Sequence, residues 1–229
     1  MKVGPVVLLF AKYPERGRVK KRLAKHLPED FVVELYRDFV LDSITCVRLA
    51  GLPLVICVDP PGAIDSIRDW LGEELLYLPQ RGDDLGDRLR NGFVEVFARG
   101  FPSAIALGTD SPDLPPTLLR GAEEGLKAND VVIGPAEDGG YYLIGFKRAS
   151  FVPSGFAGIK WSTDSVMRDT KARLLKAGCS PHILPMWHDV DVPKDLLRIG
   201  ESADRDFARS RTAKFLHENR DLWEAASRG

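Results

Sequence analysis

The fold is decided by Ser103-Ala-Ile-Ala-Leu107 and the stretch that follows it, Gly108-Thr-Asp-Ser-Pro-Asp-Leu114. The first five residues are almost all apolar, which is typical of a short buried strand. Gly108 and the prolines that follow end this strand, so Asp110 lies at its carboxyl end. Ligands of open α/β sheets bind at the carboxyl ends of strands. Asp110 is therefore a candidate ligand of a divalent metal that holds a phosphate, although an aspartate here can also simply cap a turn.

Strand-like and helix-like patterns alternate on both sides of this stretch. The strand patterns cover residues 3–10, 54–58, 75–78, 103–107, 131–133, 141–146 and about 182–184. The helical patterns cover 28–51, 63–71, 85–100, 116–127 and 164–177, with two closing stretches from Pro193 and from Asp204. The alternation predicts a three-layer α/β/α fold with a mostly parallel sheet, and the two strands around Gly139-Gly140 predict one antiparallel strand.

The chain length predicts a single domain over 1–229, with a core of about 3–200 and a helical extension of about 201–229. We expect the extension to pack on the sheet or on a second subunit of a homodimer, through its large apolar residues Phe207, Phe215, Leu216, Leu222 and Trp223.

Composition excludes several classes of function. The formal net charge of -1 gives no basic field for a nucleic-acid partner. The apolar run 6–10 is too short for a membrane span and lacks the features of a signal peptide, so we expect a cytoplasmic protein without a membrane partner. Three cysteines lie far apart in the chain, which favours buried, reduced thiols.

The loop after the first strand is rich in cations. Lys12, Lys20 and Arg22 lie in it together with Gly17, which allows close approach of a ligand to the backbone. Lysine, arginine and backbone amides at the end of a strand form a polyphosphate cradle, and Lys20 and Arg22 are the best candidates for phosphate contacts. The alternative is a solvated basic surface.

The segment from Gln80 to Arg88 opens the next helix. Asp83 or Asp84 can cap that helix, which is the simplest explanation for the acids. Gln80 and Gly82 are not needed for a cap, and they are candidates for contact with a nucleotide base.

The segment from Gly134 to Tyr142 joins two apolar strands. Its Asp-Gly pair is typical of a tight hairpin turn. We favour a functional reading, in which the acids and glycines approach a sugar or a phosphorylated acceptor; these residues are Glu137, Asp138, Gly139 and Gly140.

Asp189 and Asp191 alternate around Val190, and we expect a short strand that places both carboxylates on one face. Asp191 is a candidate second ligand for the metal of Asp110, because Mg²⁺ takes one or two carboxylates together with substrate phosphates. Capping of the helix that begins at Pro193 is the alternative.

The remaining polar residues have simpler explanations. Asp113 is best explained as a cap for the turn into the helix that follows it. The histidines lack zinc-ligand spacing, and no serine has the setting of a hydrolase nucleophile.

Six motifs in this order resemble one family over about residues 3–200. They are Ala11-Lys12-x-Pro14 with Gly17-x-Val19-Lys20-x-Arg22-Leu23, Asp84-Leu85-Gly86-x-Arg88, Gly108-x-Asp110-Ser111-Pro112-Asp113-Leu114, Glu137-Asp138-Gly139-Gly140-Tyr141-Tyr142, Trp161-Ser162-Thr163, and Asp189-Val190-Asp191-x-Pro193. The chain resembles the DUF2064 glycosyltransferase-like proteins, which are related to 2-phospho-lactate guanylyltransferase within the nucleotide-diphospho-sugar transferases of the GT-A fold.

The resemblance implies a GT-A-like sheet and a divalent cofactor, Mg²⁺ or Mn²⁺, held by Asp110 and Asp191. By position it implies that Lys20 and Arg22 hold the phosphates of the nucleotide and that Glu137, Asp138, Gly139 and Gly140 face the acceptor or sugar. Together with the candidates above, the expected nucleotide contacts are Ala11, Lys12, Gly17, Lys20, Arg22, Gln80, Gly82 and Asp110, and the expected catalytic set is Lys20, Arg22 and Asp110. Lys21 departs from the pattern, which has a small hydroxyl residue at this position.

Two reactions fit these residues. In nucleotidyl transfer, a phosphorylated acceptor attacks a nucleoside triphosphate, and the cation-rich loop favours this reaction. In glycosyl transfer from a nucleotide-sugar, Glu137 or Asp138 would serve as the base. A nucleotide-binding protein without turnover is a third hypothesis, which predicts loss of a metal carboxylate, and both Asp110 and Asp191 are present.

Overall fold

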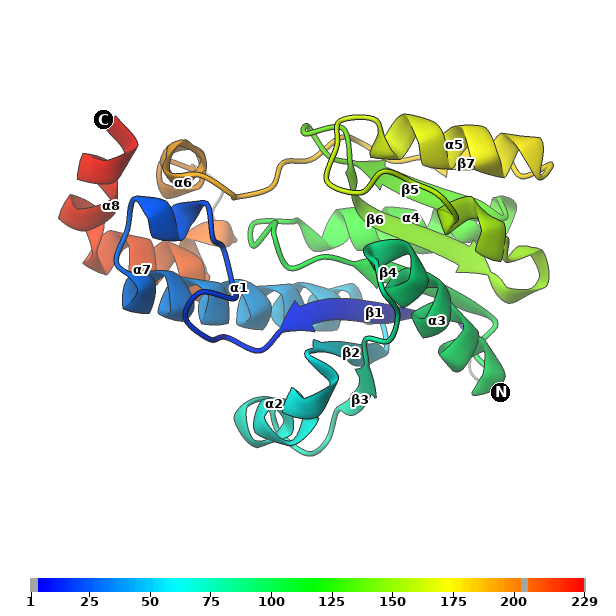
Figure 1. The fold of residues 1–229 in the computed structure, drawn as a ribbon, viewed down its shortest axis with the longest axis horizontal. Coiled ribbons are helices and arrows are strands. Elements are labelled where there is room, and N and C mark those ends of the chain that lie inside the picture. Colours follow the sequence, from blue (N-terminus) through cyan, green and yellow to red (C-terminus); the bar gives the residue numbers. More distant parts are fainter. Residues whose placement is uncertain (1–3, 203–205, 229) are drawn as a thin grey trace.

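A seven-stranded sheet forms the centre of the molecule, in the order β3-β2-β1-β4-β6-β5-β7 (Figure 1). The structure is a computed structural model and describes residues 4–202 and 206–228. The strands are β1 (Pro5–Lys12), β2 (Leu54–Asp59), β3 (Leu76–Pro79), β4 (Ser103–Leu107), β5 (Val131–Pro135), β6 (Tyr141–Lys147) and β7 (Pro181–Ile183). Only β6 runs antiparallel to its neighbours in this sheet, which confirms the predicted antiparallel strand next to Gly139-Gly140.

Eight α-helices within the described residues accompany the sheet. They are α1 (Glu29–Ala50), α2 (Ile64–Leu71), α3 (Leu85–Ala98), α4 (Pro116–Ala128), α5 (Val166–Lys176), α6 (Pro193–Gly200), α7 (Arg211–Glu218) and α8 (Arg220–Arg228). Short 3-10 turns lie at Leu23–Lys25, Pro61–Ala63, Arg148–Ser150, Pro153–Phe156 and Phe207–Arg209. None of these helices is long and apolar enough to cross a membrane.

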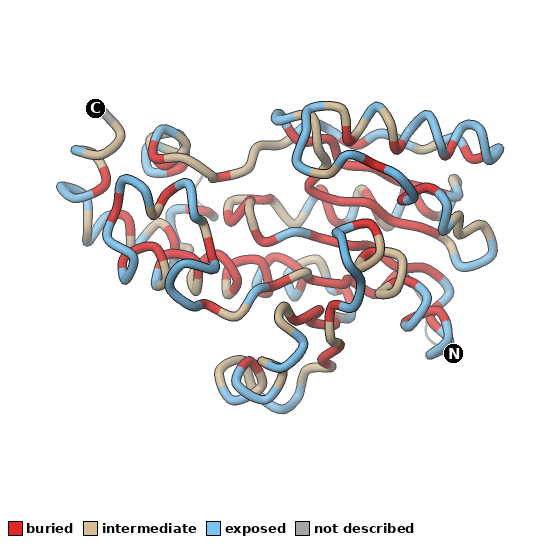
Figure 2. The backbone as a smooth tube through the Cα atoms, viewed as in Figure 1, coloured by how far each residue is buried: buried red, intermediate tan, exposed pale blue. Residues whose placement is uncertain are grey.

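The two faces of the sheet are buried by different helices. Val7 and Leu9 of β1 pack in one core with α1, α2 and α4, whereas Val6 and Leu8 pack in the other with α3 and α5. This division follows from the alternation of side chains along a strand. Figure 2 shows the strands buried along most of their length and the helices buried only on their inner faces. The three-layer α/β/α fold is therefore confirmed.

A third core joins the carboxyl-terminal helices to the amino-terminal half of α1. Leu216 and Trp223 are buried there with Phe31 and Leu35 of α1 and Ile199 of α6. Helix α7 packs on α1 and α8 packs on α6, and among the described residues this core includes none from a strand (Figure 1). Asp42 of α1 fixes the start of α7 by accepting hydrogen bonds from the backbone N–H groups of Arg211 and Thr212 at 3.1 and 2.8 Å. The helix expected from Asp204 has its first residue outside the described residues, and α7 begins at Arg211.

The short strand expected at Asp189–Asp191 is not formed. The segment after β7 forms one isolated bridge, between Trp187 and Ala136. Beyond this bridge, the N–H of Val190 donates to the carbonyl of Asp110 at 2.8 Å. One hydrogen bond to a loop does not make a ladder, because β4 has already ended at Leu107.

The three cysteines are buried and free, as predicted.

Candidate functional site

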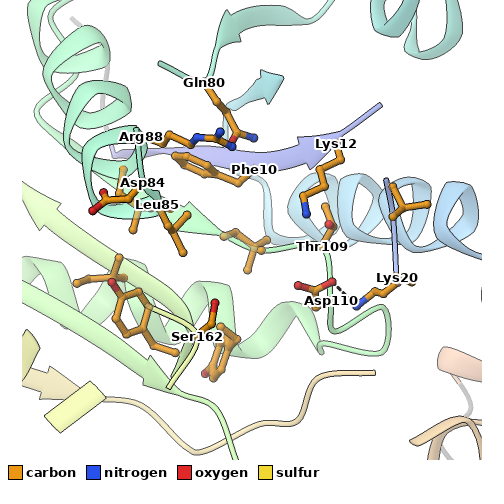
Figure 3. A pocket seen from close by; sticks show the side chains of 18 of the residues that line it. Phe10, Lys12, Lys20, Gln80, Asp84, Leu85, Arg88, Thr109, Asp110 and Ser162 are labelled. Atoms are coloured by element: carbon orange, nitrogen blue, oxygen red, sulfur yellow. Dashed lines mark ion pairs between the residues drawn. The ribbon is translucent and has the colours of Figure 1, made fainter. Parts of the chain in front are cut away.

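A cleft of about 530 Å³ lies where β1, β3 and β4 end and β6 begins (Figure 3). Parallel strands bring their carboxyl ends to one edge of the sheet, and the antiparallel β6 brings its amino end to the same edge. Four of the predicted site residues line this cleft, namely Lys12, Lys20, Gln80 and Asp110. Phe10, Leu85 and Ser162 line it as well, and sequence reasoning assigned them no role.

Lys20 connects two acids that are far apart in the sequence. Its ammonium contacts the carboxylate of Asp110 and lies 3.2 Å from an oxygen of Asp191. Only 4% of the Lys20 side chain is exposed. Burial by itself lowers the pKa of Lys20, but Asp110 and Asp191 outweigh it, and the pKa stands above its ordinary value. The lysine is therefore charged at neutral pH. Arg22 lies 3.3 Å from the other carboxylate oxygen of Asp191, Oδ2, and is largely exposed.

Asp189 is a third acid at this end of the cleft, and sequence reasoning did not assign it to the metal. Its carboxylate accepts a hydrogen bond from the hydroxyl of Ser111 at 2.9 Å. Burial, followed by the nearby charge of Asp110, raises the pKa of Asp189 to about 7. The sequence contained a signal that Asp189 lies near Asp191. The two acids flank the apolar Val190, which is fully buried.

The segment that carries these acids is held from both sides. Asp195 accepts hydrogen bonds from the backbone N–H groups of Asp191 and Val192, both at 2.8 Å. Asp113 lies 2.8 Å from the ring of His188 and accepts a hydrogen bond from the indole of Trp187 at 3.2 Å.

The prediction that Asp113 caps the turn into the next helix is wrong, because its carboxylate contacts Trp187 and His188 instead. The residue that precedes α4 is Pro115, and no side chain within the described part of the chain caps that helix. A proline at the start of a helix already removes one of the N–H groups that a cap would satisfy. Asp113 is therefore available to hold the Trp187–His188 segment.

Tyr36 of α1 connects the loop of β1 to the loop of β4. Its hydroxyl accepts a hydrogen bond from the backbone N–H of Lys12 at 2.9 Å and lies 3.1 Å from the hydroxyl of Thr109. Either of these two hydroxyls can be the donor of the bond between them. Burial raises the pKa of Tyr36 to about 12, so the phenol stays neutral. The helical spacing of α1 identified Tyr36 as a core residue and gave no sign of this second role.

Gln80 and Gly82 occupy different positions relative to the cleft. The amide nitrogen of Gln80 donates to the carbonyls of Ala11 and Cys57, at 3.3 and 2.8 Å. Both partners are acceptors, which fixes the orientation of the amide. Gly82 does not line the cleft. Its backbone φ of +133° is one that residues with a side chain rarely adopt. Asp84 caps α3, as the simpler reading predicted, by accepting from the N–H of Asp87 at 2.8 Å.

The turn between β5 and β6 does not line this cleft. Glu137 makes a two-point ion pair with Arg198 of α6, at 2.7 and 3.1 Å, and the hydrogen bonds from Arg198 lower the pKa of Glu137. Asp138 accepts a hydrogen bond at 2.8 Å from the N–H of Gly140, two residues further along the chain. Gly139 lies against the backbone of Asp164, where a Cβ would meet the carbonyl oxygen at 2.2 Å. Ala11, Gly17, Arg22 and Asp191 also lie outside the lining.

The carboxylates at this end of the cleft suit a hard cation. No three His, Cys, Asp or Glu side chains of the described residues gather closely enough to form a complete metal site. Asp110 and Asp191 nevertheless contact one and the same cationic group, Lys20. Two carboxylates completed by substrate phosphates are the usual protein environment of Mg²⁺. The residues present therefore fit a divalent ion that arrives with a phosphorylated ligand.

The fold and the position of the cleft define a three-layer α/β protein of the kind that carries its site at the carboxyl edge of the sheet. The chain belongs to the DUF2064 family, described as uncharacterized proteins conserved in bacteria, whose model matches residues 41–163. The matched region includes Asp110, Gln80 and the Glu137–Gly140 turn, and it excludes Lys20 and Asp191. A search of curated proteins found no match to this chain.

Solved structures extend the comparison to the whole chain. A protein from Desulfovibrio desulfuricans G20, provisionally named a nucleotide-diphospho-sugar transferase, is 36% identical with a TM-score of 0.92, over 97% of each chain. A nucleotidyl transferase from Methanothermobacter thermautotroptrophicus, Mth528, is 16% identical with a TM-score of 0.56, over 95% of this chain and 100% of its own. Rv0371c from Mycobacterium tuberculosis H37Rv is 20% identical with a TM-score of 0.52, over 88% of this chain and 100% of its own.

Proposed function

We propose that the protein is a metal-dependent transferase that acts on a nucleotide, and that it transfers a nucleotidyl group from a nucleoside triphosphate to a small phosphorylated acceptor. The observation that carries the proposal is the cluster at one end of the cleft, where Lys20 contacts both Asp110 and Asp191. Acids that hold a metal and a lysine that neutralises phosphate are the two elements that phosphoryl chemistry needs.

The comparisons support the class of reaction. The 36% identical relative carries a transferase name, and Mth528 shares the fold and is a nucleotidyl transferase. A structure of Rv0371c with the same fold is a complex with manganese, at 18% identity and a TM-score of 0.52 over 83% of this chain and 93% of its own. These names favour a transferase with a divalent cofactor and leave its substrate open.

The proposed reaction needs little covalent participation by the protein. A phosphate oxygen of the acceptor bonds to the α-phosphorus of the triphosphate while the bond from the α-phosphorus to the bridging oxygen breaks, and pyrophosphate leaves. The nucleophile is already anionic, so positioning and charge neutralisation are the main requirements. Lys12, Lys20 and Arg22 would neutralise the phosphates, and Asp110 and Asp191 would hold the metal. When bound, the metal supplies further positive charge at the phosphates.

Glycosyl transfer from a nucleotide-sugar is the second candidate, favoured by the name of the 36% identical relative. Its acceptor hydroxyl would need a base, for which Glu137 and Asp138 are the candidates. Glu137 is engaged by Arg198, and its pKa is lowered, which makes it a weaker base. This geometry favours nucleotidyl transfer.

Pyrophosphate release tests the proposal. The protein is incubated with Mg²⁺ or Mn²⁺, each of the common nucleoside triphosphates, and a panel of sugar phosphates and phosphorylated hydroxy acids. We expect acceptor-dependent release with at least one pair. Turnover with nucleotide-sugars alone would favour glycosyl transfer instead.

Asp110→Asn tests the metal assignment in the same assay. We expect at least a hundredfold loss of kcat/KM, because the variant loses a carboxylate that binds the cation. Asp130→Asn is the matched control, since Asp130 is exposed just before β5, at the opposite edge of the sheet. An Asp110→Asn protein with full activity would contradict the assignment.

A further inference from the structure

The ammonium of Lys20 lies between Asp110 and Asp191, the two acids that we assign to the metal. It contacts both carboxylates, and the Lys20 side chain is almost fully buried. Lys12 lines the same cleft with an exposed side chain, and no carboxylate of the described residues pairs with it. Figure 3 shows Lys20 pointing at Asp110, with Lys12 above the same acid. The two lysines carry the same ammonium group, but only Lys20 is buried and paired with acids.

The backbone also holds Lys20 in this position. Its φ of +39° lies in the left-handed region, which residues other than glycine rarely adopt. Such a conformation persists only where the surroundings fix it, and it occurs preferentially at functional sites. The surroundings here are the two ion pairs and the ring of Phe39, whose centre lies 5.6 Å from the ammonium.

The position of the Lys20 ammonium conflicts with the binding of a divalent cation to the same two acids. A metal that binds Asp110 and Asp191 would lie next to a buried ammonium, and two like charges at such short range repel strongly. The conflict disappears if the ammonium leaves. Polyphosphate offers Lys20 a new anionic partner and supplies the remaining oxygen ligands of the metal.

We propose that Lys20 is an internal counter-ion that occupies the cation site of the nucleotide-free protein and is released from Asp110 and Asp191 when the metal binds. The inference rests on the metal site of the proposed function. It implies that the free protein binds divalent ions weakly, and that metal and nucleotide phosphate enter together. Lys20 then serves two successive partners, first the acids and afterwards the phosphates.

Binding of Mn²⁺ alone, at pH 8 and without nucleotide, tests the inference. We expect Lys20→Met to bind Mn²⁺ at least tenfold more tightly than the wild type, because the competing ammonium is gone. Lys20→Arg keeps the charge and should bind as weakly as the wild type. Lys12→Met is the matched control in the same cleft and should leave Mn²⁺ affinity unchanged. Adding Asp110→Asn to Lys20→Met should abolish the gain.

Three results would overturn the inference. They are a Lys20→Met protein that binds Mn²⁺ no more tightly than the wild type, an equal gain in Lys12→Met, and a gain that survives Asp110→Asn. Thermal unfolding of each variant checks that it is folded.

The wild-type protein provides a second readout that needs no variant. Lysine acetylation followed by mass spectrometry should find Lys20 slow to react without metal and several times faster with saturating Mn²⁺. Lys21, which is exposed next to it, is the internal control and should not respond. Unchanged protection of Lys20 at saturating Mn²⁺ would contradict its release. Mn²⁺ binding and acetylation are independent of turnover, so a protein that releases no pyrophosphate can still pass both tests.

Discussion

Asp113 shows how one side chain can support a site that it does not enter. Its carboxylate is largely buried, with 9% of the side chain exposed, and it binds both Trp187 and His188. These two residues immediately precede Asp189 and Asp191. The position of the acids therefore depends on a contact between two loops that lie far apart in the sequence.

Asp113→Ala is expected to lower the free energy of unfolding by about 2 kcal/mol, because the hydrogen bond from Trp187 to a carboxylate and the contact with His188 are lost while the partner groups stay buried. Urea unfolding measures the change. Asp113→Asn should cost less, since its amide oxygen can still accept from Trp187. Equal stability of wild type and Asp113→Ala would show that the Trp187–His188 segment is held by other contacts.

Helix α1 contributes to two regions of the molecule. Tyr36 and Phe39 lie beside the cleft, at Thr109 and under Lys20. The same helix carries Asp42, which fixes the start of α7. A helix of 22 residues is about 33 Å long at 1.5 Å per residue, so it can connect both regions as one rigid body.

Two glycines test how closely the β5–β6 turn packs against the loop before α5. Gly139 and Gly178 both have positive φ, +89° and +81°, but only Gly139 has a backbone against it. Gly178→Ala should cost about 1 kcal/mol, the penalty of a left-handed residue. Gly139→Ala should cost clearly more, because the new Cβ also pushes away Asp164 in the loop before α5.

Thermal unfolding of both variants measures the difference. We also expect Gly139→Ala to reduce kcat/KM, since the displaced loop carries Ser162 at the wall of the cleft. Equal losses of stability in the two variants would mean that the loop moves aside freely.

Most of the fold could be predicted from local patterns. The helical spacing of α1, with acids after Pro28 and a stop at Gly51, predicted a helix that the structure places at Glu29–Ala50. Gly51 adopts the left-handed conformation that suits a helix end. The antiparallel strand was predicted from two apolar runs around a tight turn. Such signals are local, so a single sequence is enough to read them.

The candidate site was only partly predictable, because its contacts are long-range. Lys20 and Asp191 are 171 positions apart, and Ser111 and Asp189 are 78 positions apart. No local pattern reports such pairs. The prediction of a strand at Asp189–Asp191 was wrong for this reason. The N–H of Val190 donates to a carbonyl in another loop, and no strand of the described residues pairs with the segment there. The roles of Arg22, Gly82 and the Glu137–Gly140 turn stay predictions.

The pH dependence of global stability is a prediction for the whole molecule. Burial, followed by the charge of Asp42, raises the pKa of Asp38 to about 6, while Arg211 lowers it and Glu34 and Glu218 raise it further. The folded protein thus holds this proton more tightly than the unfolded chain does. The stabilising contribution is fully present below about pH 4, the ordinary value, and is lost as the pH rises through about 6.

Asp38→Asn removes this titration. We expect the variant to be more stable than the wild type by about 1 kcal/mol at pH 7, a value reduced for the partial exposure of the group. The advantage should vanish at pH 4. Guanidinium unfolding at both pH values measures it, and a constant difference between the two proteins would contradict the assignment to Asp38.

The distance in sequence between Lys20 and Asp191 has a consequence for the protein's synthesis. A ribosome that has made the loop after β4 has already incorporated Lys20 and Asp110, while Asp191 is still many codons away. During that interval the nascent chain holds only part of its cation-binding group, and Lys20 has a single acid to neutralise it. Any affinity that needs both acids therefore appears only after the chain has emerged as far as Asp191.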